Sequence, residues 1–239
     1  MNVKDLFQEE VEPGLQNWIN KFESPVDMLN SLEELFSDVK GQKILGKVED
    51  KVSIEGPVFI GPGSVVHSGA VIRGPVFIGS NVSVRPLCHL RKNAYIGSNC
   101  VVGKGAHIKN SLCLNGSKIQ SDTFVGDSVL GAGVRIGSGA VLANRKFNQT
   151  RVRIMDLKGR TQLTAREFLG SVLGDYVRIG ANAVLSPGTI IGPFTWVGSG
   201  VILQGTYEGD LYIGLKQELD IRKKSRRKLR SGEGEYEEV

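Results

Sequence analysis

Aliphatic residues recur at every sixth position along the middle of the chain, from Ile54 to Leu114, without a miss. A helix places apolar residues about 3.6 positions apart and an isolated strand places them at every second position, so neither element explains a strict period of six. A β-solenoid does, because three hexads of about eighteen residues close one triangular coil and every sixth side chain points inward. The predicted inward positions are Ile54, Ile60, Val66, Ile72, Ile78, Val84, Leu90, Ile96, Val102, Ile108 and Leu114.

The period slips after Leu114 and then stops. It moves by one residue to Ile119 and Val125 and by one more at Leu130, and we expect a site near these irregular hexads of an otherwise regular scaffold. Residues 144–169 keep no sixfold pattern, and their alternation around Arg153 with a turn at Gly159 predicts a hairpin-like insertion. The repeat resumes at Leu173, Ile179, Leu185, Ile191, Val197 and Leu203, which gives about seven coils in all.

Residues 1–43 are predicted to form an N-terminal helical segment. Amphipathic helical turns are expected before residue 23, with an interruption at Pro13-Gly14. A longer helix follows, because Ser24 can cap it, Pro25 suits its first position and an apolar face continues toward Gly41. An open solenoid end exposes apolar core and unpaired strand edges, so we expect this helix to cover the first coil.

The predicted architecture is therefore all-β, with a parallel β-helix over residues 44–206 and a C-terminal extension over residues 207–239. In that extension, residues 207–229 are expected to leave the solenoid and close its far end. Apolar residues make up 40% of the 239 residues, which is enough for one sizeable core. Cys88, Cys100 and Cys113 are odd in number, and no disulfide is expected among them.

The net formal charge of +5 comes from a short tail. Residues 222–230 carry seven basic side chains and no acidic one, and an acidic run follows, so the rest of the chain is close to neutral. A solvated tail is the simpler interpretation and nucleic acid is not the expected partner. Neither an apolar run near twenty residues nor a leader is present, so a cytoplasmic protein without a membrane span is expected.

Five short segments together resemble one family. They are residues 89–97 (HLRKNAYIG), 108–111 (IKNS), 116–118 (GSK), 125–128 (VGDS) and 136–144 (IGSGAVLAN). With the shortened hexads and the interruption after Asn144, they are similar to the acetyltransferase domain of the bifunctional sugar-1-phosphate nucleotidylyltransferases/acetyltransferases. The resemblance implies a left-handed coil and a homotrimer with sites between neighbouring solenoids. The nucleotidylyltransferase domain does not precede this segment, so uridylyl transfer is not expected.

The resemblance also assigns binding roles to individual residues. Arg91 and Lys109 fall where the family holds the phosphate of a sugar phosphate or sugar nucleotide, and Asn144 falls in the substrate pocket. Charged donors are what a phosphate requires. The co-substrate implied is acetyl-CoA or another acyl-CoA, with no metal. The positions that line its slot in the family are Gly180, Ala181, Gly198 and Ser199.

The catalytic positions of the family are not retained. Its general-base histidine falls on Ser121, its tyrosine on Phe124 and an asparagine on Arg135. Acetyl transfer to an amine requires a base near neutral pH, and a serine hydroxyl is far too weakly basic. Asp122 and His107 are the candidate replacement bases.

Two functions therefore remain open. One is N-acetyl transfer to a glucosamine-1-phosphate-like acceptor. The other is a catalytically silent homotrimer that binds a sugar phosphate or a partner protein. His89 and His107, eighteen residues apart, should stack on adjacent coils. A histidine metal site would need a third ligand, and His67 has a different offset, so no metal site is predicted.

Overall fold

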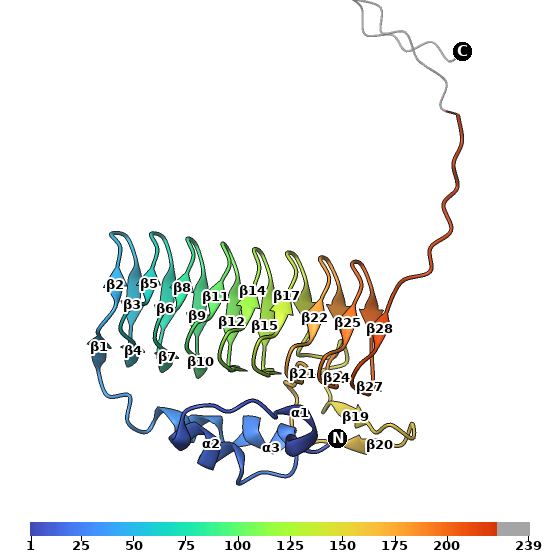
Figure 1. The fold of residues 1–239 in the computed structure, drawn as a ribbon, viewed down its shortest axis with the longest axis horizontal. Helices are drawn as coiled ribbons and strands as arrows, with labels where there is room; N and C mark the ends of the chain where they lie inside the picture. Colours follow the sequence, from blue (N-terminus) through green and yellow to red (C-terminus); the bar gives the residue numbers. More distant parts are fainter. Residues whose placement is uncertain (224–239) are drawn as a thin grey trace, which may run out of the picture.

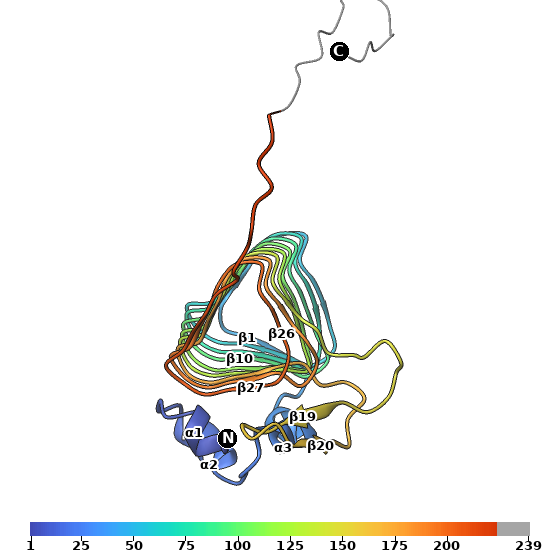
Figure 2. The ribbon, with the colours of Figure 1, turned by 90° about the vertical axis from the view of Figure 1, so that its right-hand side faces the viewer.

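The computed structural model describes residues 1–223, which form one parallel β-helix with three flat faces (Figures 1 and 2). All strand pairs along each face are parallel, which confirms the predicted β-solenoid; its left hand stays a prediction. Sheet 1 contains β1 (Gln42–Ile44), β4 (Val58–Ile60), β7 (Val76–Ile78), β10 (Ala94–Ile96), β13 (Leu112–Cys113), β16 (Val129–Leu130), β21 (Val172–Leu173), β24 (Ile190–Ile191) and β27 (Thr206–Tyr207).

Sheet 2 contains β2 (Lys47–Val48), β5 (Val65–Val66), β8 (Ser83–Val84), β11 (Val101–Val102), β14 (Lys118–Ile119), β17 (Arg135–Ile136), β22 (Arg178–Ile179), β25 (Trp196–Val197) and β28 (Tyr212–Ile213). Sheet 3 contains β3 (Ser53–Glu55), β6 (Val71–Arg73), β9 (His89–Arg91), β12 (His107–Lys109), β15 (Phe124–Gly126), β18 (Val141–Leu142), β23 (Val184–Leu185) and β26 (Ile202–Leu203).

The described residues form eight complete coils and part of a ninth, so the estimate of about seven is wrong. The missed strands, β1 and β2 at one end and β27 and β28 at the other, lie where the step between inward residues falls from six to four, as from Ile44 to Val48 and from Leu203 to Tyr207. The repeat continues to Ile213, so residues 207–213 extend the solenoid rather than leave it. Residues 214–223 run away from the last coil (Figure 1). The predictions for the rest of the basic tail and for the acidic run concern residues 224–239, outside the described part.

The first slip in the repeat lies one hexad earlier than predicted. Cys113 pairs in register with Ile96 and Leu130 and is fully buried in the solenoid core, whereas Leu114 packs on the outside against the N-terminal helices. The step from Ile108 to Cys113 is thus five residues, as is the step from Val125 to Leu130. The same corner, between sheets 3 and 1, is shortened in two successive coils. The sixfold count from Ile108 falls on Leu114, which is aliphatic, so the sequence did not reveal that Cys113 takes the inward position.

The N-terminal helices lie along sheet 1 and not over the first coil, so that prediction is wrong (Figures 1 and 2). They are α1 (Val3–Leu6), α2 (Pro13–Ile19), α3 (Pro25–Asn30) and the 3₁₀ helix η1 (Leu32–Phe36). Pro13 begins α2 instead of interrupting it, and the predicted long helix divides into α3 and η1. The Ser24 cap is confirmed, since its hydroxyl accepts the Val26 N–H at 3.3 Å.

Apolar burial explains this placement. The outward side chains of sheet 1 are themselves apolar, including Tyr95, Leu112 and Val129, and they pack against Leu6, Trp18, Met28 and Leu32. Each square ångström of apolar surface removed from water contributes about 25 cal/mol, so covering these outward apolar side chains stabilises the helices along sheet 1.

The insertion forms an antiparallel hairpin of β19 (Arg153–Met155) and β20 (Thr161–Leu163), as predicted. It lies beside α3 along the face that the helices cover (Figure 2). Val152 is buried with the helical cluster, and the Thr206 hydroxyl donates to the Met155 carbonyl. Within residues 1–223 no helix is both long and apolar enough to cross a membrane.

Candidate functional site

The outer face of sheet 3 carries two columns of candidate site residues, because parallel in-register strands stack equivalent positions one coil apart. His89, His107 and Phe124 form one column. The two imidazole rings stack with centroids 4.7 Å apart, as predicted, and Phe124 meets His107 edge-on at 5.3 Å. Arg91 and Lys109 are neighbours in the second column.

His107 does not have the geometry of a general base. The Arg91 Nε–H donates to His107 Nε2 at 2.9 Å, so the imidazole lone pair is already occupied. Burial, followed by the neighbouring His89, Arg91 and Lys109, lowers the pKa of His107 to about 4. A neutral imidazole with an occupied lone pair is a poor proton acceptor near pH 7. The pKa of His89 is also lowered, first by burial and then by Arg91 and Arg73.

The centre of the polar network is Asp127, which the sequence analysis did not single out. Its carboxylate accepts from Lys109 Nζ at 2.9 Å, Asn110 Nδ2 at 2.7 Å, Asn144 Nδ2 at 2.6 Å and Arg166 Nη2 at 3.3 Å. The Asp127 side chain is only 3% exposed. The structure thus brings Lys109 and Asn144 together, and it places an internal carboxylate between them.

The shortened corner creates this arrangement. Asn110 and Asp127 turn the chain there with φ values of 46° and 48°, in the left-handed region that Asn and Asp tolerate better than other non-glycine residues. Since both corners are one residue short, the two side chains lie directly over one another and hydrogen-bond. The network lies at the irregular hexads, where a site was expected from the sequence, but its central residue was missed; the site itself stays a prediction.

Arg166 joins three parts of the fold. Besides Asp127, it contacts the Leu29 carbonyl at 3.1 Å and Asn30 Oδ1 at 3.0 Å at the end of α3. Phe168, from the same insertion, lies under the Lys109 ammonium at 4.5 Å and the Arg145 guanidinium at 5.0 Å. Between α3 and the insertion is a pocket of about 470 Å³ whose lining includes Lys109, Asp127 and Arg166.

The other predicted site residues lie at the corner between sheets 2 and 3. Backbone hydrogen bonds connect this corner from coil to coil, from Gly139 N–H to the Ser121 carbonyl and from Gly200 N–H to the Ala181 carbonyl. Ser121, Ala181 and Ser199 therefore share one edge of the solenoid. Gly180 and Gly198 precede the last two, and a Cβ at Gly180 would collide with the backbone of Ser199. The corner is narrow and carries small side chains, as a slot for an extended ligand requires.

Two predicted residues are not part of the Asp127 network. Asp122 is exposed on a corner with a φ of 57°, next to Ser121. Arg135 lies on the outer face of sheet 2, between Lys118 and Arg178, and so points away from sheet 3 within one chain. His67 pairs with Glu49 at 3.1 Å, and no three His, Cys, Asp or Glu side chains of residues 1–223 converge as metal ligands.

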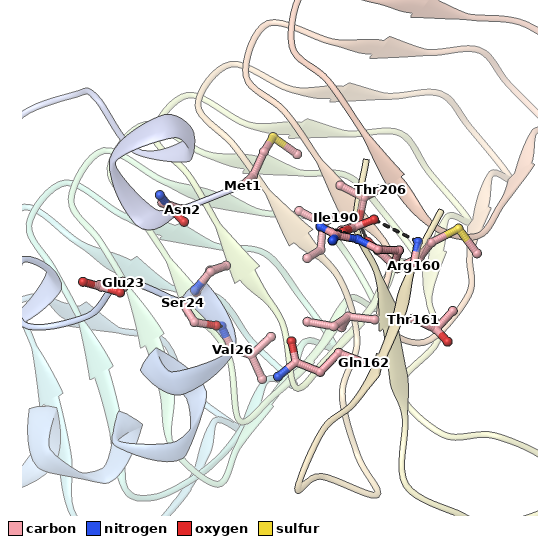
Figure 3. A pocket seen from close by; sticks show the side chains of 14 residues that line it. Met1, Asn2, Glu23, Ser24, Val26, Arg160, Thr161, Gln162, Ile190 and Thr206 are labelled. Carbon is pink, nitrogen blue, oxygen red and sulfur yellow. Dashed lines mark hydrogen bonds and ion pairs between the residues drawn. The ribbon is translucent and has the colours of Figure 1, made fainter. Parts of the chain in front are cut away.

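A second pocket, of about 440 Å³, lies between the N-terminal segment and the hairpin (Figure 3). Glu23 and Ser24 line one side, and Thr161 and Gln162 line the other. Its one basic side chain, Arg160, is paired with Asp156 at 2.7 Å. This pocket has no excess positive charge among its lining side chains and contains none of the predicted site residues.

Comparison with known proteins assigns this sequence to a family. The family described as the GMPPB C-terminal domain matches residues 72–193, a span that includes the His89–His107 stack, Asp127 and the whole insertion. The chain belongs to the GMPPB C-terminal domain family.

Curated relatives agree with this family. The bifunctional protein GlmU of Methanococcus maripaludis (strain C7) is 38% identical over 230 residues, which cover 94% of this chain and 55% of that protein. The bifunctional sugar-1-phosphate nucleotidylyltransferase/acetyltransferase of Sulfurisphaera tokodaii is 36% identical over 159 residues, 66% of this chain and 39% of that protein. The resemblance inferred from the short segments is confirmed. The chain spans about half the length of the curated relatives it matches, or less.

Among solved structures, the UDP-N-acetylglucosamine acyltransferase of Francisella novicida superposes with a TM-score of 0.50 at 14% identity. The match covers 70% of this chain and 61% of that one. At this identity the likeness supports the fold alone. It agrees with the parallel solenoid found in this member of the GMPPB C-terminal domain family.

Proposed function

We propose that this chain is an acyltransferase-type domain that binds a phosphorylated amino sugar or sugar nucleotide on sheet 3 and an acyl-CoA along the corner between sheets 2 and 3. The single observation that carries the proposal is the convergence of Arg91, Lys109, Asn144 and Arg166 on one face, in a chain whose relatives are named as sugar-1-phosphate acetyltransferases. Three cationic side chains lie there with one buried carboxylate, that of Asp127, which pairs with Lys109 and Arg166. The face therefore carries excess positive charge.

In this proposal Arg91 and Lys109 bind the phosphate, and Phe124 and Asn144 position the sugar. Gly180, Ala181, Gly198 and Ser199 provide the narrow edge for the acyl-CoA. Neighbouring subunits of a homotrimer complete the site, which gives Arg135 of sheet 2 a place opposite sheet 3 of another copy. Large exposed apolar side chains on sheets 2 and 3, Trp196, Tyr212 and Ile202, are 50%, 76% and 74% exposed and support such association.

The acetyl-transfer step needs a group that removes a proton from the acceptor amine as the C–N bond forms and the CoA thiolate leaves. Ser121 cannot take that proton, and the lone pair of His107 is occupied. Asp122 is the exposed carboxylate nearest in sequence. A second candidate function, binding without turnover, is favoured by these same two observations.

Both candidates can be tested with purified protein. Glucosamine-1-phosphate and acetyl-CoA are each added at about a hundredfold their dissociation constants, where binding adds about 2.7 kcal/mol to the free energy of unfolding. For a chain of this length that corresponds to roughly 5–10 °C in melting temperature. If neither ligand raises the melting temperature, the proposal is contradicted. Stabilisation that Arg91→Gln abolishes and that Lys47→Gln, at an exposed position of the first coil, preserves supports the phosphate site.

Turnover separates the two candidates. Acetylation by the unchanged chain should be slow, and Ser121→His with Phe124→Tyr should raise the rate at least about tenfold, since a positioned base contributes about 10²–10⁴. Ser138→His is the matched control, because Ser138 lies on the same corner one coil later. A gain only at Ser121 supports an acyltransferase site that lacks its base. Unchanged binding with no gain supports the silent binder.

A further inference from the structure

Three aromatic side chains form a stacked ladder on the outer face of sheet 1, away from the proposed acyltransfer site. Phe59, Phe77 and Tyr95 occupy the same position in three successive coils. Their ring centroids are 4.9 Å and 4.4 Å apart, with interplanar angles of 11° and 9°. Because the faces of the rings contact each other, their edges point outward from the sheet.

Within residues 1–223, an aromatic ring covers one end of this ladder and not the other. Phe36 of η1 stands nearly perpendicular to Tyr95, with centroids 6.5 Å apart and an angle of 72°. Such edge-to-face packing is favourable because the positive ring edge meets the negative ring face. No aromatic residue among residues 1–223 takes the corresponding place beside Phe59 and Phe77. A pocket of about 360 Å³ lies there instead.

The pocket has an apolar interior and a basic mouth. Leu15 of α2, Leu35 of η1 and Val39 form walls around the aromatic floor. Lys40 and Lys43 lie at the rim and are exposed, and neither makes an ion pair within the described residues; Asp38 is the one acidic lining residue. The Lys43 ammonium lies 5.8 Å from the centre of the Phe59 ring. A volume of this size is within the range of small-molecule sites, about 300–1,000 Å³.

We propose that this pocket binds a small aromatic monoanion, with its ring beside Phe59 and Phe77 and its anionic group at Lys40 and Lys43. The ring takes the place that Phe36 takes beside Tyr95. The anion neutralises the excess positive charge at the mouth. The site is separate from the proposed acyltransfer site, because it lies on sheet 1 and shares no residue with the Asp127 network.

The probe for the test is 8-anilinonaphthalene-1-sulfonate, an aromatic monoanion whose fluorescence rises in apolar surroundings. Titration of the full chain should give one saturable site. Lys43→Glu should weaken binding about fivefold or more, because it replaces an attractive charge with a repulsive one at an exposed position. Val39→Phe places an aromatic ring of the chain in the pocket and should abolish binding. Lys47→Glu, on sheet 2 of the same coil, is the matched control and should leave binding unchanged.

Tryptophan emission reports where the probe binds. The chain has two tryptophans, Trp18 on α2 one turn from Leu15 and Trp196 near the other end of the solenoid. In Trp196→Phe, bound probe should quench Trp18 by energy transfer in step with the saturable phase. Octanesulfonate, an aliphatic anion, and 1-aminonaphthalene, a neutral aromatic, should each compete at least about fivefold more weakly than naphthalene-1-sulfonate.

The result that overturns the proposal is probe binding that is non-saturable, that is equal in all four proteins, or that leaves the Trp18 emission of Trp196→Phe unquenched. Equal competition by octanesulfonate refutes the aromatic preference, and equal competition by 1-aminonaphthalene refutes the anionic one. Since Lys43 is exposed, loss of binding in Lys43→Glu with an unchanged melting temperature cannot be attributed to misfolding.

Discussion

Replacing Asp127 by asparagine should destabilise the protein severely. The carboxylate faces the Lys109 ammonium at 2.9 Å and the Arg166 guanidinium at 3.3 Å, and the two basic side chains are only 13% and 17% exposed. Asparagine keeps the size of the side chain but removes its charge, so two largely buried cations lose their counter-ion. Its amide NH₂ also turns a donor toward Asn110 or Asn144, which are donors themselves.

Removing one partner of a buried ion pair costs about 3–5 kcal/mol, because an uncompensated charge stays behind. At about 2–4 °C per kcal/mol for a chain of this length, the melting temperature should fall by roughly 6–20 °C. The measurement is thermal unfolding followed by circular dichroism, with urea unfolding as a second probe. Trypsin should also cut the 144–169 insertion sooner in the variant, because Arg166 no longer ties it to the solenoid.

Asp122→Asn is the matched control. Asp122 also lies at a corner with positive φ, 57° against 48° for Asp127, so the same substitution makes the same conformational demand at both positions. Asp122 is exposed and has no ion pair among the described residues, so its replacement should change the melting temperature by no more than about 2 °C. If the Asp127→Asn protein melts within 2 °C of the Asp122→Asn protein, the network does not stabilise the fold as argued.

Two further outcomes follow from the site and from the proposed assembly. The pKa of His107 is lowered to about 4 from an ordinary value near 6.5. Between these two pH values the unfolded chain binds a proton that the folded chain does not, so the free energy of unfolding falls as the pH falls. His107→Gln should therefore lose less melting temperature than the unchanged protein between pH 7.5 and pH 5, and equal losses contradict the shift. Sedimentation at micromolar concentration should show a trimer that Ile202→Glu, at a side chain 74% exposed, weakens or dissociates, and a monomer refutes the intersubunit site.

The period of six predicted the core of the solenoid well, because each coil places an apolar side chain inward at the same three positions. It failed where two apolar residues compete for one inward position. Cys113 and Leu114 are adjacent, and the sequence alone favours the leucine, yet the short corner at Asn110 turns Cys113 inward. The end coils were missed for a related reason, since four-residue steps at Ile44 and Tyr207 break the period before the strand pairing ends.

The covered face of the solenoid has a sequence signal of its own, separate from the period of six. Strands of sheet 1 are apolar at consecutive positions, as in Val58-Phe59-Ile60 and Val76-Phe77-Ile78, whereas sheet 3 alternates, as in His89-Leu90-Arg91. Continuous apolar strands are typical of sheets buried on both faces. This signal predicts that another element, the amphipathic N-terminal segment, packs on the outer face of sheet 1. The position of Arg166 had no such signal, because an insertion without a period gives no register.

The Asp127 network bears on the proposed phosphate site. Lys109 forms an ion pair with Asp127 and Arg91 donates a hydrogen bond to His107, so both basic side chains already have partners within the chain. The half-buried groups still do not balance, because Arg91, Lys109 and Arg166 carry three positive charges against the one negative charge of Asp127, and His107 stays neutral at pH 7. The exposed Glu33, Glu167 and Lys92 around the pocket are screened by water and offset this excess only weakly. In the proposed function, a phosphate monoester, close to doubly ionised at neutral pH, supplies the missing charge without displacing Asp127, which holds the basic side chains in place before the ligand arrives.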